Sequence, residues 1–332
     1  MKNNLKQILN ICSPSGYTMK ITKYLEKKLE EMGFTVKYTK KGSLYVYIDS
    51  NKKETICLTS HIDTLGFMIK SLNDDGTLGL SNIGGPIVST VNGEYCTIFT
   101  RNNKEFRGTI LDKNRAIHVH KKASDKNIID NLIVRVDEKV NSKQDLLDLG
   151  LNIGNYVCYD SKVEFVGDYV KSRFLDDKAG VVALLELLQN LDTSNLNKNL
   201  LVYFSIYEEV GHGGSSLPID VDEFIAVDMG CIGENLNGSE EKVSICVKDS
   251  SGPYDYEITS KMIEIAEEIV IPYAIDVYPM YSSDGSCFLR GGNDAKVALV
   301  GPGVDASHGM ERTTITAIKN TSKLLLTYLY KN

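Results

Sequence analysis

Imidazole and carboxylate side chains follow several short apolar segments of this sequence. These residues are His61, Glu208, Glu209, Asp228 and His308. The apolar segments before them are typical of β-strands. In open α/β sheets the ligand crevice lies outside the carboxyl ends of the strands, so residues that are distant in sequence converge there. We therefore expect these five side chains to meet at one edge of one sheet.

Asp176 is expected to reach the same edge from the start of a helix. The Asp176-Asp177 pair precedes Lys178–Leu191, a segment that is apolar on most faces and hence typical of a buried helix. Taken alone, such a pair would be an N-cap with a second acid that the helix dipole favours. In this position it adds a sixth candidate side chain to the same cleft.

A structural role is the ordinary interpretation of each residue taken singly. A lone histidine near a strand end is more often hydrogen-bonded or exposed than bound to a metal, and Glu208-Glu209 could be a solvated turn. The joint pattern favours a metal site, because two imidazoles with several carboxylates are suitable ligands for two divalent ions. Imidazole favours zinc or cobalt over magnesium.

A two-ion site requires further roles that this set of residues can fill. One carboxylate has to bridge the ions, and one acid has to stay off them to take a proton from the attacking water. The adjacent Glu208 and Glu209 offer this division if both lie in the turn beyond the strand, since consecutive strand residues point to opposite faces. Asp63, two residues after His61, is placed to hold the second imidazole nitrogen and fix its tautomer.

Elements that could position these residues are predicted around them. An amphipathic helix is expected at Thr18–Met32, and strands are expected at Thr55–Thr59, Leu200–Ile206, Phe224–Val227 and Ala295–Val300. Near-continuous apolar runs such as these suit the central strands of a sheet that is covered on both faces. We expect an α/β fold with a central, mostly parallel sheet flanked by helices.

A separate β unit is predicted within this α/β sequence. Between about Ser71 and Asp160, short apolar segments alternate with Asn-Asp-Asp-Gly, Gly-Gly-Pro and Arg-Asn-Asn turns, and one short helix is expected at Lys143–Leu149. The expected domains are therefore an α/β catalytic domain, residues 1–70 and 161–332, and a small inserted β domain, residues 71–160.

Composition excludes several classes of function. The 332 residues carry 37 basic and 44 acidic side chains, for a net charge of -7, without the clustered basic face that nucleic-acid binding needs. No apolar run approaches the roughly 20 residues that span a bilayer, and the start lacks a secretory signal. Seven scattered cysteines without a Cys-x-x-Cys motif argue against a disulfide framework or a thiolate zinc site. We expect a cytoplasmic protein without nucleic-acid or membrane partners.

Several segments resemble the tetrahedral metallo-aminopeptidase family, which includes glutamyl and deblocking aminopeptidases and members named endoglucanases. The resemblance spans nearly the whole chain and depends on the order and spacing of short motifs. These motifs are Ser13–Gly16, Ser60–Met68, Phe174–Gly180, Tyr207–Gly211, Ala226–Asp228 and Ser307–Gly309.

The resemblance implies a role for each candidate residue. Asp176 would bridge two divalent ions, zinc or cobalt, and the other ligands would be His61, Asp228, Glu209 and His308. Glu208 would be the general base of an aminopeptidase that removes N-terminal residues from short peptides. The inserted region would be a barrel-like dimerisation domain, and the homo-oligomer would be built from dimers, up to a dodecamer.

Other functions remain open at this point. A related two-metal deacylase or carboxypeptidase would use the same metal chemistry, and a non-catalytic assembly or binding homologue could keep the fold. A polysaccharide hydrolase needs two carboxylates flanking a sugar and no pair of metals, so the name endoglucanase gains no support. The Ser282–Ser286 and His308 loops depart from the commoner family pattern, so substrate preference is not carried over.

Overall fold

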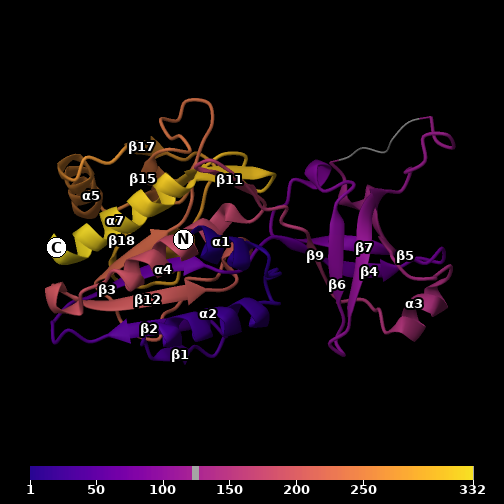
Figure 1. The fold of residues 1–332 in the computed structure, drawn as a ribbon, viewed down its shortest axis with the longest axis horizontal. Coiled ribbons are helices and arrows are strands. Elements are labelled where there is room, and N and C mark those ends of the chain that lie inside the picture. Colours follow the sequence, from indigo (N-terminus) through magenta and orange to yellow (C-terminus); the bar gives the residue numbers. More distant parts are fainter. Residues whose placement is uncertain (122–126, 332) are drawn as a thin grey trace.

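A mixed sheet is the central element of the computed structural model, which describes residues 1–121 and 127–331 (Figure 1). Within these residues ten strands form the sheet, in the order β1-β2-β12-β3-β13-β18-β15-β16, with β14 paired to β18 and β17 to β15. The strands are β1 (Val36–Tyr38), β2 (Leu44–Ile48), β3 (Thr55–His61), β12 (Asn199–Ser205), β13 (Glu223–Val227), β14 (Gly230–Cys231), β15 (Val243–Asp249), β16 (Gly252–Pro253), β17 (Tyr273–Val277) and β18 (Lys296–Val304).

The centre of the sheet is parallel. Four strands, in the order β12, β3, β13 and β18, pair with one another in parallel. On the two outer sides, β2 pairs with β12 and β15 pairs with β18, both antiparallel. Every residue of β3, β12 and β13 is buried, which is the state that their continuous apolar sequences predict. The expected α/β fold with a mostly parallel central sheet is confirmed.

Helices cover both faces of this sheet. Alternate strand residues point to opposite faces, so Ile56 and Leu58 join the core that includes α4, whereas Cys57 joins a second core with Phe288 of α6. The helices of this part are α1 (Lys2–Leu9), α2 (Met19–Glu31), α4 (Leu175–Gln189), α5 (Tyr256–Glu268), α6 (Asp284–Arg290) and α7 (Ile315–Lys331). The buried helix that was predicted after Asp177 is α4.

A closed barrel lies beside the sheet, at the other end of the long axis in Figure 1. Its strand order is β4-β5-β8-β7-β6-β9, and β9 closes the ring by pairing with β4. These elements are β4 (Gly66–Leu72), β5 (Thr77–Ile83), β6 (Tyr95–Phe99), β7 (Glu105–Asp112), β8 (Leu132–Val136), β9 (Tyr156–Tyr159) and the helix α3 (Lys143–Leu149). Only four residues separate the end of β3 from the first strand of the barrel, so the carboxyl end of β3 lies at the junction with the barrel.

Smaller elements complete this junction. A three-stranded antiparallel sheet joins β10 (Glu164–Val166), β11 (Tyr169–Ser172) and β19 (Glu311–Thr314). Short 3-10 turns follow β5 at η1 (Val88–Thr90) and β12 at η4 (Glu208–Val210). In the part of the chain that the structure describes, no helix combines the length and apolar character needed to cross a membrane.

Candidate metal centre

His61 is the last residue of β3, and its side chain is almost fully buried. Its Nε2 atom lies 3.1 Å from Oδ1 of Asp176 and 3.7 Å from Oε2 of Glu208. Its Nδ1 atom lies 3.0 Å from the backbone carbonyl oxygen of Asp63. When Nδ1 donates its proton to this carbonyl, the lone pair of Nε2 faces the carboxylates and can bind a cation.

Asp176 lies between the two histidines. Oδ1 faces Nε2 of His61 at 3.1 Å, and Oδ2 faces Nε2 of His308 at 3.5 Å. Burial opposes ionisation of Asp176, but hydrogen bonds from His308 and His61 outweigh it and lower the pKa of Asp176. The peptide bond between Asp176 and Asp177 is cis. One oxygen directed at each imidazole is the arrangement that a carboxylate shared by two cations requires.

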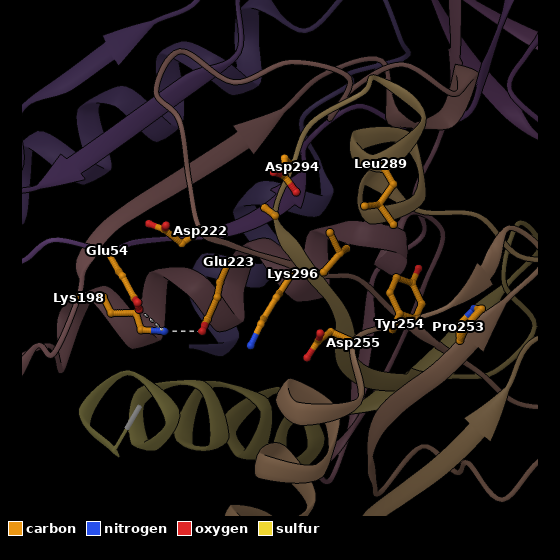
Figure 2. A pocket seen from close by; sticks show the side chains of 12 residues that line it. Glu54, Lys198, Asp222, Glu223, Pro253, Tyr254, Asp255, Leu289, Asp294 and Lys296 are labelled. Carbon is orange, nitrogen blue, oxygen red and sulfur yellow. Dashed lines mark hydrogen bonds and ion pairs between the residues drawn. The ribbon is translucent and has the colours of Figure 1, made fainter.

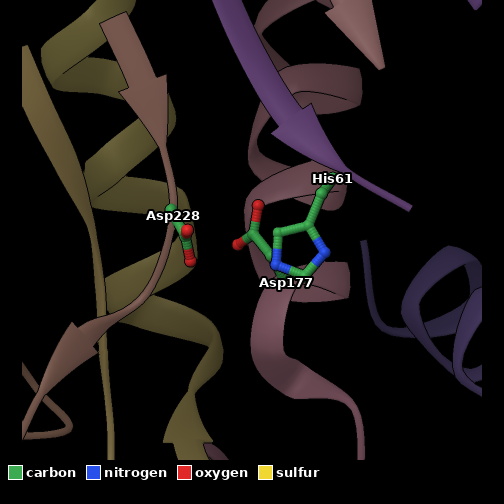
Figure 3. A group of neighbouring side chains, drawn as sticks. All are labelled: His61, Asp177 and Asp228. Atoms are coloured by element: carbon green, nitrogen blue, oxygen red, sulfur yellow. The ribbon is translucent and has the colours of Figure 1, made fainter. Parts of the chain in front are cut away.

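Asp228 and Asp177 also lie beside His61 (Figure 3). The three side chains each offer one ligand atom, and these atoms all lie within 4.8 Å of one another. Asp177 also accepts hydrogen bonds from the Ser60 hydroxyl and from the N–H of Gly180, the latter at 3.2 Å. Both carboxylate oxygens of Asp177 thus accept protein hydrogen bonds. Asp228 lies at the end of β13, as the sequence predicted, and its Oδ1 accepts the N–H of Met229 at 2.6 Å.

Glu208 and Glu209 lie in the η4 turn beyond β12, as their proposed division of roles requires. Glu209 forms a second group of ligand atoms with His61 and Asp176, again within 4.8 Å. Its Oε2 lies 3.7 Å from Nε2 of His308, and its buried Oε1 has no hydrogen-bond partner among the described residues. Glu208 is thus close to His61, whereas Glu209 lies near both histidines.

Asp63 acts differently from the sequence-based expectation. Its carboxylate lies 3.7 Å from Nδ1 of His61, farther than its own backbone carbonyl, which holds that nitrogen at 3.0 Å. The carboxylate instead accepts the N–H groups of Glu208 and Glu209, at 3.2 and 3.4 Å, and the hydroxyl of Ser15. Asp63 thus orients His61 through its main chain and holds the η4 turn through its side chain.

His308 is held by Glu311, a residue that sequence reasoning did not single out. The N–H of His308 donates to Oε1 of Glu311 at 2.9 Å, while Oε2 accepts the N–H groups of Leu175 and Asp176, at 2.5 and 3.2 Å. Glu311 is 1% exposed, and burial together with the charge of Asp176 raises its pKa to about 8. The contact with His308 is local, but no sequence pattern indicates the contacts with Leu175 and Asp176, because they join segments about 135 residues apart.

The cluster has more negative groups than its two imidazoles can balance. Burial, followed by repulsion from neighbouring carboxylates, raises the pKa of Asp228 to about 7 and that of Glu208, Glu209 and Asp177 well above the usual range. Divalent cations would offset this repulsion and give the unpartnered oxygen of Glu209 a ligand bond. Imidazole nitrogens and carboxylate oxygens together form a donor set that suits zinc or cobalt.

A cavity of about 680 Å³ lies at the opposite edge of the sheet (Figure 2). Its lining includes Glu54, Lys198, Glu223 and Lys296, which stand at the amino ends of β3, β12, β13 and β18. Lys198 forms ion pairs with both Glu54 and Glu223. This cavity is therefore remote from the histidines and belongs to the other end of the parallel strands.

Comparisons with known proteins identify the family of this chain. A family model described as M42 glutamyl aminopeptidase matches residues 42–324. The chain is 39% identical to YhfE of Bacillus subtilis, a protein named as an aminopeptidase, over 98% of this chain and 96% of that protein. It is 24% identical to the glutamyl aminopeptidase of Lactococcus lactis, over 68% of this chain and 65% of that protein.

Solved structures share the fold over the full length. The TET1 peptidase of Pyrococcus horikoshii, which can assemble into a tetrahedron or a large octahedral shell, has a TM-score of 0.88 at 21% identity and covers 100% of this chain and 99% of its own. An aminopeptidase from the archaeon Desulfurococcus kamchatkensis has a TM-score of 0.87 at 22% identity, with coverage of 99% and 94%. The β-barrel inserted into an α/β sheet is thus a shared architecture.

Proposed function

Because this chain belongs to the M42 glutamyl aminopeptidase family, we propose that it is a two-metal aminopeptidase that removes N-terminal residues from short peptides. The observation that carries the proposal is the position of Asp176, whose two oxygens face Nε2 of His61 and Nε2 of His308 at 3.1 and 3.5 Å. A carboxylate in this position is suited to bridge two cations, each of which would also bind one imidazole.

In the proposed site the remaining carboxylates are divided between two ions. Asp228, near His61, would complete the ligands of one ion, and Glu209, near His308, would complete those of the other. Zinc or cobalt is the proposed metal, because the donor set mixes imidazole with carboxylate. Asp177 would stay outside the ligand set, because its carboxylate already accepts hydrogen bonds from Ser60 and Gly180.

Glu208 is the proposed general base. Two bound divalent ions would make the scissile carbonyl more electrophilic and the attacking water more acidic. Glu208 would take the proton from that water and pass it to the departing amine, because it lies at the same site and directs its carboxylate toward His61 at 3.7 Å. Asp63 would keep Glu208 in place by accepting its backbone N–H.

We expect activity to depend on both the metal and a free N-terminal amine. Protein stripped with a chelator should lose hydrolysis of aminoacyl and short-peptide substrates and should regain it on addition of zinc or cobalt, with two ions bound per chain. N-acylated peptides serve as matched substrates for a deacylase. Peptides in which only release of the C-terminal residue is detected serve as matched substrates for a carboxypeptidase. Release of product from each is measured by chromatography.

The same substrate panel separates the competing functions. Cleavage restricted to N-acylated substrates would replace the aminopeptidase with a deacylase, and release of C-terminal residues alone would indicate a carboxypeptidase. Full activity after complete removal of metal would end the two-metal proposal. A protein that binds two ions but cleaves none of the substrates would fit a non-catalytic homologue.

A homo-oligomer built from dimers is also proposed. The TET1 peptidase of Pyrococcus horikoshii forms closed shells, and this chain shares its fold over its full length, including the barrel. Light scattering coupled to size-exclusion chromatography should give a mass that is an even multiple of the chain mass, with twelve as the largest expected multiple. A monomer at micromolar concentration would contradict this prediction.

A further inference from the structure

The barrel touches the candidate metal centre directly through the segment Gly84–Thr90, between β5 and the end of η1. The carbonyl oxygen of Gly85 lies 2.8 Å from Nδ1 of His308, so this imidazole is oriented by the barrel. The N–H of Ile87 donates to the carbonyl oxygen of His308 at 3.3 Å. Gly84 adjoins Glu209, because a Cβ atom added at Gly84 would lie 3.2 Å from the Glu209 carbonyl oxygen.

Arg173 joins this segment to the His308 loop. Its guanidinium donates to the carbonyl oxygen of Thr90 at 2.8 Å and to the carbonyl oxygen of Gly309 at 3.2 Å. It also forms an ion pair with Glu94 at 3.2 Å and lies over the ring of Tyr159, 5.2 Å from the ring centroid. One side chain therefore connects the barrel to the residue that follows His308.

The burial of Arg173 makes its geometry specific. Only 2% of this residue is exposed, so its charge depends on Glu94 and on the two carbonyl oxygens. A guanidinium presents several donors in one rigid plane, whereas a lysine ammonium is a compact charge that cannot reach the same set of acceptors in a fixed geometry. The same guanidinium donates to the loop that carries His308, a candidate ligand. A contact that served only to join the two domains would not require this hydrogen bond.

We propose that the Gly84–Thr90 segment is part of the metal centre and that Arg173 is the positioning residue that holds it against the His308 loop. This inference rests on the proposed two-ion site and assigns the inserted β region a task at the site besides assembly. The carbonyl of Gly85 fixes the tautomer and the direction of the His308 imidazole. Arg173 holds the Gly84–Thr90 segment and the His308 loop together. Disturbing either contact should weaken the ion bound by His308 and spare the ion bound by His61 and Asp228.

The test is calorimetric titration of metal-free protein with zinc, in which the step that disappears in His308→Ala identifies the ion at that histidine. In Arg173→Lys this step should weaken by about 10- to 100-fold, the usual effect of losing a residue that orients a metal ligand. Arg107→Lys is the control, because Arg107 forms an exposed ion pair with Asp160 away from His308. The control should leave both binding steps unchanged.

Ile87→Pro provides a second variant that leaves the buried guanidinium intact. The φ angle of Ile87 is -72°, which proline adopts, and the side chain is exposed, so the change removes mainly the N–H donor to His308. The same binding step should weaken about two- to tenfold, as expected for one hydrogen bond. Ile87→Ala removes the side chain and keeps the donor, so it should bind both ions like the wild type.

The outcomes distinguish this inference from the proposed function. Two binding steps in the wild type, unchanged in both Arg173→Lys and Ile87→Pro, would overturn the inference and leave the proposed function standing. Equal weakening of both steps would overturn it as well, since a general loosening of the fold would then be the cause. A wild type with a single binding step would overturn the two-ion proposal, and the inference with it.

Discussion

A Glu208→Gln variant is expected to lose about 10²- to 10⁴-fold in kcat, the usual contribution of a positioned general base. Glutamine has nearly the same shape and keeps the backbone N–H that Asp63 accepts, so the η4 turn should be preserved. It cannot accept the proton of the attacking water. The rate should therefore fall while the metal content of two ions per chain stays unchanged.

Steady-state kinetics on an aminoacyl substrate, together with metal analysis of the same preparation, checks this prediction. Glu264→Gln is the matched control, because Glu264 lies on the exposed side of α5 and pairs there with Lys261. A Glu208→Gln enzyme as active as this control would remove Glu208 from the mechanism. Loss of one ion in Glu208→Gln would instead make Glu208 a ligand and exchange its role with that of Glu209.

The strands that present the site were predictable because they are buried on both faces. β3, β12 and β13 read as continuous apolar runs, and their observed bounds differ from the predicted ones by only one or two residues. By contrast, the sequence pattern did not identify α1, an eight-residue helix. Such short helices are marginal alone, and α1 depends on burying Leu5, Ile8 and Leu9 against the core that includes α4.

The candidate ligands could be found from sequence, but the residues that support them could not. Three of the candidate positions, His61, Asp228 and the Glu208 turn, lie at the carboxyl ends of strands. Because these ends meet at one edge of a parallel sheet, the proximity of the three follows from the predicted strands alone. Glu311 and Arg173 act through backbone groups of segments far away in the chain, and such contacts leave no local signature. Asp63 does contact the second nitrogen of His61, but through its backbone carbonyl, whereas its carboxylate holds the Glu208 turn, and spacing alone does not distinguish these two groups.

The Ser282–Ser286 segment lies behind the Glu208 turn. Asp284 is buried, and its carboxylate accepts the N–H of Gly214 at 2.6 Å and the hydroxyl of Ser205 at the end of β12. Asp63 holds the start of the turn, and Asp284 holds the chain that follows it. The segment therefore contributes to the support of Glu208.

An Asp176→Asn variant should have the largest effect on the metal centre, because it changes the carboxylate whose two oxygens face the two histidines, at 3.1 and 3.5 Å. An amide has a single oxygen and no charge, so it cannot bridge two cations. Both ions should bind more weakly, whereas His308→Ala should affect only one of them. Because the ions are expected to stabilise the transition state by several kcal/mol, activity should fall by about 10³-fold or more.

Metal content after dialysis and kcat/KM at saturating zinc measure these two effects separately. Asp74→Asn is the control, since Asp74 lies exposed in the turn between β4 and β5. Circular dichroism of the metal-free proteins shows whether the Asp176→Asn chain still folds. An Asp176→Asn protein that folds, retains two tightly bound ions and keeps the activity of the control would show that Asp176 is not the bridge. The shared carboxylate would then have to be sought in Glu209, which forms a ligand group with His61 and Asp176 and lies 3.7 Å from Nε2 of His308.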